Sequence, residues 1–250
     1  MFRPQILFVF ACLFASAPAV AQSGTAAEID DKAAVSAPMT ESQAQCELHV
    51  FPTENYLGFN SGLLIGFGAI GAAIDSASHK NRVMTVTDLM KGYLGPDMQI
   101  QELTKIGIAK TLKLSADYRV IVEAPTPSHE DAKRDPAIKA QAKKFNADVK
   151  AGKRLTGSTN PCYAELILTN LFYHKAMMYG SNLFVPIMFR DFGNGRTTPV
   201  TSTGSVKNPL EYFPPKTPDM VALAKTELRD AFAKDFVEWS QKKLSGEITH

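Results

Sequence analysis

This 250-residue sequence has few cysteines and almost no excess of either charge, and both features limit what the protein can do. Lys and Arg (27 residues) nearly balance Asp and Glu (25 residues), for a net charge of +2. A nucleic-acid-binding protein needs a broad positive potential, so this balance argues against nucleic acid as a partner. The 5 histidines have no partner at the i,i+3 or i,i+4 spacing that brings two metal ligands onto one helix face.

Signatures of catalysis are also missing. No GxSxG nucleophile elbow occurs, and Asp191-Phe192-Gly193 matches the kinase metal-binding triplet without the Gly-rich and catalytic loops that accompany it. The sequence therefore indicates no catalytic residue, no cofactor and no metal ligand. A hydrolase or other small-molecule enzyme stays an alternative, with a site assembled from distant loops, and a deep pocket near His49, His174 or Asp191 would favour it.

The first 21 residues are typical of an export signal. Arg3 precedes an apolar run over residues 6–15, and Ala19-Val20-Ala21 places small residues at a cleavage site before Gln22. This run is too short to cross a bilayer, which takes about 20 residues. We therefore expect residues 1–21 to be removed and the chain to be exported: periplasmic in a Gram-negative source, secreted otherwise. No transmembrane span is expected in the mature chain.

Two cysteines remain once Cys12 leaves with the signal. Cys46 and Cys162 would meet an oxidising compartment, where paired thiols usually form a disulfide. Two separate buried thiols are the alternative interpretation. A metal site would need a second pair of ligands that the sequence does not place beside them.

Hydrophobic periodicity predicts an α/β (α+β) protein with a mixed sheet of about four to five strands and helices packed mainly on one face. Residues 22–44 have the composition of a flexible tether, and residues 45–245 are expected to form a single domain with a charged insertion at about 128–160. The expected strands cover residues 46–51, 118–122, 162–172, 183–191 and, after an Asn194-Gly195 hairpin turn, an edge strand near 196–202. Residues 53–60 are expected to form a loop. The expected helices cover residues 61–78, 87–114 with a break near Gly95-Pro96, about 136–150, and 217–244. One face of the last helix carries an apolar stripe that includes Leu228, Phe232 and Trp239.

The predicted helix over residues 61–78 contains Gly66-Phe67-Gly68-Ala69-Ile70-Gly71, which matches the GxGxxG dinucleotide fingerprint. The match stands alone, and helical spacing explains more of the segment. One face of the helix would carry only small residues, which suits close packing or contact with a bilayer or partner: Gly62, Gly66, Ala69 and Ala73.

A second candidate surface lies in the charged insertion. A helix beginning near Pro136 would bury a stripe that includes Ile138 and Phe145, and the opposite face would carry Lys139, Lys143 and Lys150. Such a face suits an anionic partner, such as phospholipid headgroups or an acidic protein. A solvated insertion is the simpler alternative.

A resemblance to known proteins rests on two short segments and on the order of the expected elements. The segments are residues 71–75 (Gly-Ala-Ala-Ile-Asp) and 78–82 (Ser-His-Lys-Asn-Arg), and the order is strand, Gly-rich helix, long helix and strands. Over roughly residues 46–125 the chain resembles a loose group of bacterial envelope, lipoprotein-like proteins with a Gly-rich GAxID segment. These are similar to the small α/β domain at the start of the Tol-Pal periplasmic protein and in the curli-secretion lipoprotein. The resemblance implies a binding or assembly role and no catalytic residues. The chain departs from the group in lacking a convincing lipobox.

The sequence thus favours an exported cell-envelope protein that acts as a non-enzymatic binding or assembly module. An envelope protein or anionic lipid is the expected partner, and peripheral attachment to a membrane is a further alternative to the enzyme.

Overall fold

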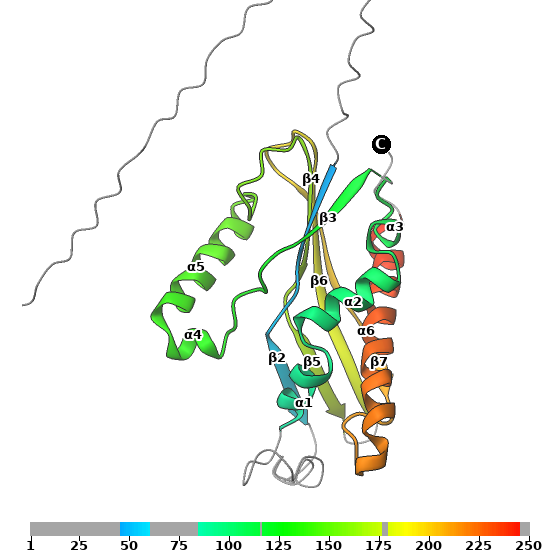
Figure 1. Ribbon diagram of the computed structural model, residues 1–250. Coiled ribbons are helices and arrows are strands. Elements are labelled where there is room, and N and C mark those ends of the chain that lie inside the picture. Colours follow the sequence, from blue (N-terminus) through cyan, green and yellow to red (C-terminus); the bar gives the residue numbers. More distant parts are fainter. Residues whose placement is uncertain (1–45, 61–84, 116, 177–179, 246–250) are drawn as a thin grey trace, which may run out of the picture. The chain divides into compact units, whose positions relative to one another are not determined.

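The computed structural model describes residues 46–60, 85–115, 117–176 and 180–245 (Figure 1). The expected signal, tether and Gly-rich helix lie outside these ranges. The strands are β1 (Cys46–Phe51), β2 (Tyr56–Asn60), β3 (Tyr118–Val122), β4 (Cys162–Leu168), β5 (Leu171–Ala176), β6 (Gly180–Asn194) and β7 (Val200–Leu210). The helices are α1 (Val86–Tyr93), α2 (Pro96–Lys105), α3 (Ile108–Thr111), α4 (Asp131–Arg134), α5 (Pro136–Lys150) and α6 (Val221–Leu244), with a 3-10 turn at Pro218–Met220.

The strands form one mixed sheet, as expected from the sequence. β1 lies parallel between β3 and β4, and β2 lies parallel to β5. The long strand β6 runs antiparallel to both β4 and β5 along one side and to β7 along the other. The α/β class is therefore confirmed, with 7 strands rather than four to five.

The additional strands arise because two extended segments are interrupted. The predicted strand over residues 162–172 divides into β4 and β5 at Thr169 and Asn170, and β2 occupies part of a segment predicted to be a loop.

The break between β4 and β5 and the break between β1 and β2 lie at one buried polar cluster. The amide of Gln99 on α2 pairs with the backbone of Thr53, accepting from its N–H at 2.9 Å and donating to its carbonyl at 2.9 Å. The Asn55 amide donates to the carbonyl oxygens of Pro127 and Thr169. Buried backbone groups that lose their strand partners thus find side-chain partners here.

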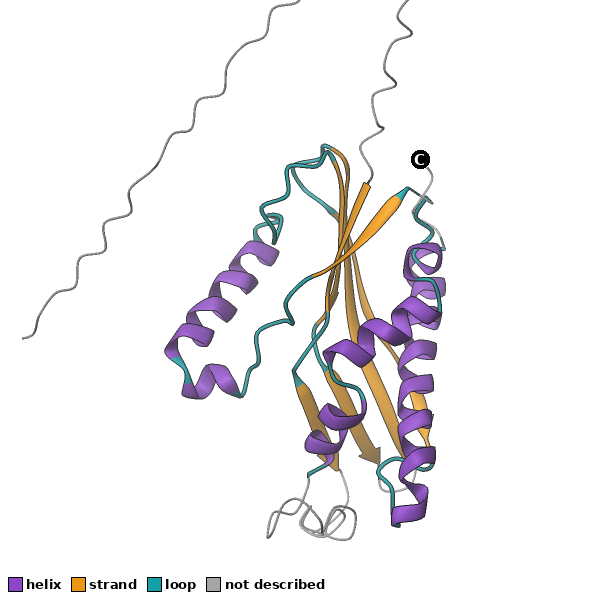
Figure 2. Cartoon of the chain, viewed as in Figure 1, coloured by secondary structure: helices purple, strands orange, loops and turns teal. Residues whose placement is uncertain are grey.

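Helices α1, α2, α3 and α6 pack on one face of the sheet, whereas α5 lies on the other side (Figures 1 and 2). Leu48 and Val50 of β1 belong to the core between the sheet and these helices. The stripe predicted for the last helix faces this core, with Leu228, Phe232 and Trp239 fully buried. At about 25 cal/mol per Å² of apolar area, such burial dominates the stability of the fold.

Helix α5 begins where the sequence predicts. Asp135 caps it by accepting from the Ala137 N–H at 2.7 Å, and Pro136 fills the first turn, where no N–H partner is needed. Its apolar stripe meets the sheet through Phe145, whose ring lies edge-on to Phe51 with centroids 6.0 Å apart. No residue of α5 is fully buried, so the helix stands at the margin of the fold.

Candidate functional site

The predicted disulfide is present. Cys46 and Cys162 begin the neighbouring parallel strands β1 and β4, and their Cα atoms are 4.7 Å apart. The bond closes a loop of 116 residues, and such a crosslink typically adds about 2–4 kcal/mol to stability. It holds together the ends of two strands far apart in the sequence.

A buried cluster of ionisable groups lies on the sheet face that carries α5. The His49 Nδ1 lies 2.6 Å from a Glu123 carboxylate oxygen, and its Nε2 lies 3.1 Å from Glu47. The Ser158 hydroxyl donates to Glu47 at 2.5 Å. This hydrogen bond, together with those from His49 and Arg119, lowers the pKa of the Glu47 carboxyl to about 2 against the effect of burial.

The next pair on this face is fully buried. The Arg190 guanidinium donates to Glu165 at 2.6 Å and to the Lys153 carbonyl at 2.6 Å. Glu165 also accepts from the Leu155 N–H and the Tyr163 hydroxyl. Burial raises the pKa of the Glu165 carboxyl, and these donors with the guanidinium oppose that rise.

Geometry indicates what this cluster does. Both nitrogens of His49 face carboxylates, and the Ser158 hydroxyl bonds to Glu47 instead of the imidazole, so the three do not form a nucleophile with its base. Instead, Glu47, Glu165 and Arg190 each hold a group of the 153–158 segment that returns from α5. The cluster therefore fixes this segment on the sheet.

The second predicted surface is solvent-exposed. Lys139, Lys143 and Lys150 project from α5, and none of them makes an ion pair with a described residue. Lys144, by contrast, pairs with Asp148 at 2.6 Å. The three lysines therefore form an outward cationic stripe. The other predicted surface, formed by Gly62, Gly66, Ala69 and Ala73, lies outside the described residues.

A surface that sequence reasoning missed lies on the same side of the sheet as α5. Strand register places Leu57 beside Phe172 and Phe184, and in the next row Phe59 beside His174. We call these five residues the aromatic surface. The rings of Phe59 and Phe172 lie nearly parallel to His174, with centroids 5.7 and 5.9 Å away. Phe59 is 53% exposed and Leu57 43% exposed.

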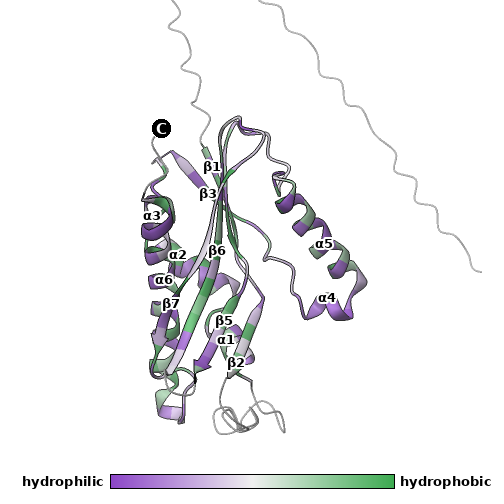
Figure 3. Ribbon diagram, turned by 180° about the vertical axis from the view of Figure 1, so that it is seen from behind, coloured by the Kyte–Doolittle hydropathy of each residue, from purple (hydrophilic) through white to green (hydrophobic). Residues whose placement is uncertain are grey.

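The aromatic surface follows from alternation. Tyr56, Tyr173 and Leu183 point into the core on the opposite face, so their neighbours in sequence must point outward. Hydrophobic stretches of the strands are visible beside the mostly hydrophilic α4 and α5 in Figure 3. The alternation of residues 56–59 was the available signal, but the sequence interpretation assigned them to a loop.

Comparison of the chain with protein-family models, curated proteins and solved structures finds no match. Among the described residues, no helix is long and apolar enough to cross a membrane. No group of three or more His, Cys, Asp or Glu side chains in the described part of the chain is placed to hold a metal ion.

Proposed function

We propose that the protein is a non-enzymatic binding module of the cell envelope, outside the cytoplasm, and that its aromatic surface attaches to an anionic phospholipid surface. The export-type leader and the Cys46–Cys162 disulfide both suit an oxidising compartment. The observation that carries the proposal is the aromatic surface itself: a row of three large apolar side chains beside the Phe59–His174 pair, all left partly open to solvent. Contiguous patches of this kind mark interaction sites.

Burial of this surface supplies a useful attachment energy. A fully buried Phe or Leu side chain is worth about 1.5–3 kcal/mol. Covering the exposed parts of Phe59 (53%) and Leu57 (43%) therefore contributes about 2 kcal/mol, or roughly 30-fold in affinity.

The charges near the aromatic surface favour an anionic phospholipid surface over a neutral one. The row that contains Phe184 continues into Lys207 on β7, and the row that contains His174 continues into Asn182, so neither row contains a carboxylate. The lysines of α5 lie on the same side of the sheet and can attract anionic headgroups without touching them, over a screening length of about 8–10 Å. Aromatic rings beside cations suit the interfacial layer of a bilayer.

The course of the chain supports the same partner. β2 ends at Asn60, directly after Phe59, and the sequence continues with 14 residues (61–74) that carry no charged side chain. The chain therefore leaves the aromatic surface into an uncharged apolar stretch, which an acidic protein surface would not favour.

The test is sedimentation of the exported, processed chain with vesicles of phosphatidylcholine alone or mixed with phosphatidylglycerol. We expect binding to the anionic vesicles and about 30-fold weaker binding for Leu57→Ser/Phe59→Ser. The matched control is Leu223→Ser, since Leu223 is 47% exposed on α6, which covers the opposite face.

Charge is tested separately with Lys139→Gln/Lys143→Gln/Lys150→Gln, which should weaken binding at low salt and flatten its salt dependence. Equal binding of wild type and Leu57→Ser/Phe59→Ser overturns the proposal, and so does failure of the wild type to bind anionic vesicles. A partner protein that cross-links to position 59 while vesicles do not bind would also overturn it, and would make the surface a protein interface.

A further inference from the structure

The sheet ends at β3, which pairs with a strand on one side only. β1 lies beside it, and no other strand in the described part of the chain pairs with it. Such an edge presents N–H and C=O groups that another strand can bind. Native edges are commonly protected by lysine, proline or a bulge. Residues 119–123 read Arg-Val-Ile-Val-Glu, pair with β1 in unbroken register, and have none of these protections.

The backbone groups of Val120 and Val122 face the free edge. The Glu123 N–H donates to the Val50 carbonyl at 2.9 Å, which identifies the residues of this segment that bond to β1. In a parallel pair, a residue that bonds to the neighbouring strand directs both its N–H and its C=O toward it, and the next residue directs both away. Residues 119, 121 and 123 therefore face β1, whereas the N–H and C=O of the two valines point away from the sheet.

The side chains of the same two valines are open to solvent. Val120 is 40% exposed and Val122 is 53% exposed. Register places them beside Leu48 and Val50, which are buried in the core on the helix-bearing face. The apolar face of the sheet therefore extends to its last strand, where it is left partly uncovered beside outward-facing backbone groups.

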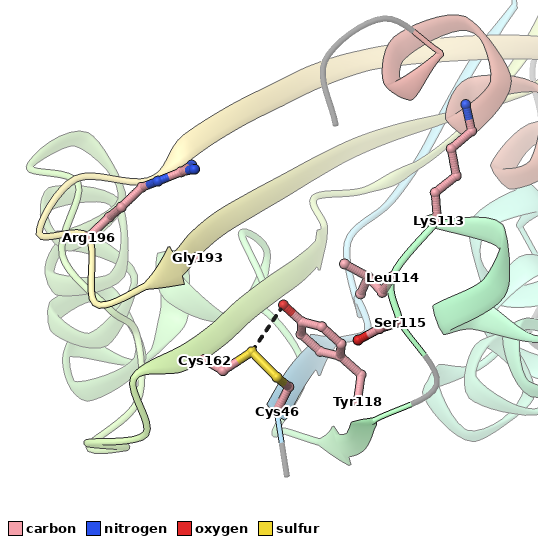
Figure 4. A pocket seen from close by; sticks show the side chains of 8 residues that line it. All are labelled: Cys46, Lys113, Leu114, Ser115, Tyr118, Cys162, Gly193 and Arg196. Carbon is pink, nitrogen blue, oxygen red and sulfur yellow. Dashed lines mark hydrogen bonds between the residues drawn. A yellow bond between two sulfur atoms is a disulfide. The ribbon is translucent and has the colours of Figure 1, made fainter. Parts of the chain in front are cut away.

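The start of β3 is held at the disulfide end of the sheet. Figure 4 shows Tyr118 at a cavity that it lines together with Cys162 and Arg196, and its hydroxyl lies 3.4 Å from the Sγ of Cys162. The rest of the strand is held by its register with β1. A partner would therefore meet a strand that is already ordered, which lowers the entropy that pairing must overcome.

The edge is complementary to a second copy of itself. We consider two β3 strands in antiparallel pairing, related by a twofold axis at Ile121. Val120 then lies opposite Val122 of the other copy, and these outward-facing residues form the hydrogen-bonded pairs of the ladder. Arg119 lies opposite Glu123 of the other copy in a non-hydrogen-bonded pair, the kind in which side chains come closest. Backbone groups, apolar side chains and charges thus match at a single register.

Both charged side chains can make this contact. Arg119 is 58% exposed, and one of its nitrogens donates to Glu47 at 3.0 Å, which leaves it further N–H donors. One carboxylate oxygen of Glu123 lies against His49, and the other has no hydrogen-bond partner among the described residues. Opposite charges directly across a strand pair stabilise the pairing.

We propose that two copies of the chain pair through β3 in an antiparallel, twofold-symmetric dimer that joins their sheets into one. Val120 and Val122 supply the backbone hydrogen bonds and the apolar contact, and the contacts between Arg119 and Glu123 fix the register. Because each copy uses its β3 edge, the assembly closes at two chains. β3 and β2 lie at opposite ends of the strand order, so the dimer leaves the aromatic surface open and does not depend on attachment to lipid.

The test is analytical ultracentrifugation of the processed chain over a range of concentrations, because a short strand pairing makes a small interface. We expect wild type to pass from monomer to dimer between micromolar and millimolar concentration. Arg119→Glu and Glu123→Arg should each weaken dimerisation about tenfold, because like charges then face each other across the axis. An equimolar mixture of the two variants should form dimers again, since opposite charges face each other in the mixed pair. Mixing cannot repair damage to the fold of either variant.

A second readout locates the twofold axis. Opposite residues of a non-hydrogen-bonded pair have Cα atoms about 4.5 Å apart, a distance that a disulfide can span. Ile121→Cys should therefore yield a dimer linked between the two copies of position 121 under mild oxidation. Val200→Cys is the matched control, because Val200 is 45% exposed on β7, outside the proposed interface.

Three results would overturn the proposal: a wild type that stays monomeric to millimolar concentration, a mixture that dimerises no better than its components, or equal crosslinking of Ile121→Cys and Val200→Cys. If dimers form only after residues 22–44 are deleted, that segment covers β3 in the intact chain and a second copy is not the occupant.

Discussion

Replacing Asp235 by Asn should stabilise the protein at alkaline pH. Asp235 lies on α6 against β7, and its side chain is completely buried. One carboxyl oxygen accepts from the Asn208 amide at 2.6 Å, whereas the other has no hydrogen-bond partner among the described residues. Burial raises the pKa of this carboxyl from 3.8 to about 8. Asn has the same shape as the protonated acid and cannot ionise.

The sign and size of the effect follow from the two pKa values. Between pH 4 and pH 8 the folded protein keeps the Asp235 proton while the unfolded chain loses it, so stability falls as pH rises through this window. A rise in the pKa of Asp235 from 3.8 to about 8 corresponds to at most about 6 kcal/mol of stability lost at high pH. We expect the free energy of unfolding of Asp235→Asn to match that of wild type within about 1 kcal/mol near pH 4. At pH 8 the variant should be several kcal/mol more stable than wild type.

Urea unfolding at pH 4.5, 6.5 and 8, with the disulfide intact, measures this difference. The single tryptophan, Trp239, is buried one helical turn from Asp235 and reports unfolding by its fluorescence. Glu165 also has a raised pKa, but it is present in both proteins and cancels in the comparison. Parallel pH profiles for the two proteins, or a variant that is less stable at pH 8, would refute the reasoning.

Two further predictions concern the other buried interactions. Arg190→Met leaves the Glu165 carboxylate buried without its cationic partner and should lower the free energy of unfolding, measured with urea at pH 7, by about 3–5 kcal/mol. Adding Glu165→Gln should recover part of this loss, and no recovery would show that the charge is not responsible. Replacing Cys46 and Cys162 together by Ser should lower the free energy of unfolding by about 2–4 kcal/mol. Non-reducing peptide mapping of the wild type should yield the 46–162 crosslink, and free thiols at both positions would contradict the structure.

Local pattern was enough to predict the features that depend on one segment at a time. The stripe on the last helix, the Pro136 start of α5 and the edge position of the strand after Asn194-Gly195 all follow from side-chain periodicity and turn chemistry. Predicting the pairing of Cys46 with Cys162 required only the expectation of an oxidising compartment and of two remaining thiols. These inferences involve no knowledge of how strands are ordered.

The features missed depend on contacts between distant segments. The break between β1 and β2 is stabilised by Gln99 and Asn55, whose partners lie 46 to 114 residues away. The aromatic surface exists because register aligns β2 with β5, and β5 with β6. The cavity lined by Tyr118, Cys162 and Arg196 likewise needs the turn that carries Arg196 to reach the start of β3. A single sequence without strand order cannot supply these alignments.

Contact between the aromatic surface and lipid can be measured with Phe59→Trp and vesicles of brominated phospholipid, which quench tryptophan only at close range. Trp239 is fully buried, so wild type provides the internal control. Attachment through this surface predicts that brominated anionic vesicles quench the emission of Phe59→Trp and leave that of wild type unchanged. If the variant binds these vesicles and its emission is the same with and without bromine, Phe59 does not meet the bilayer and the proposed attachment is wrong.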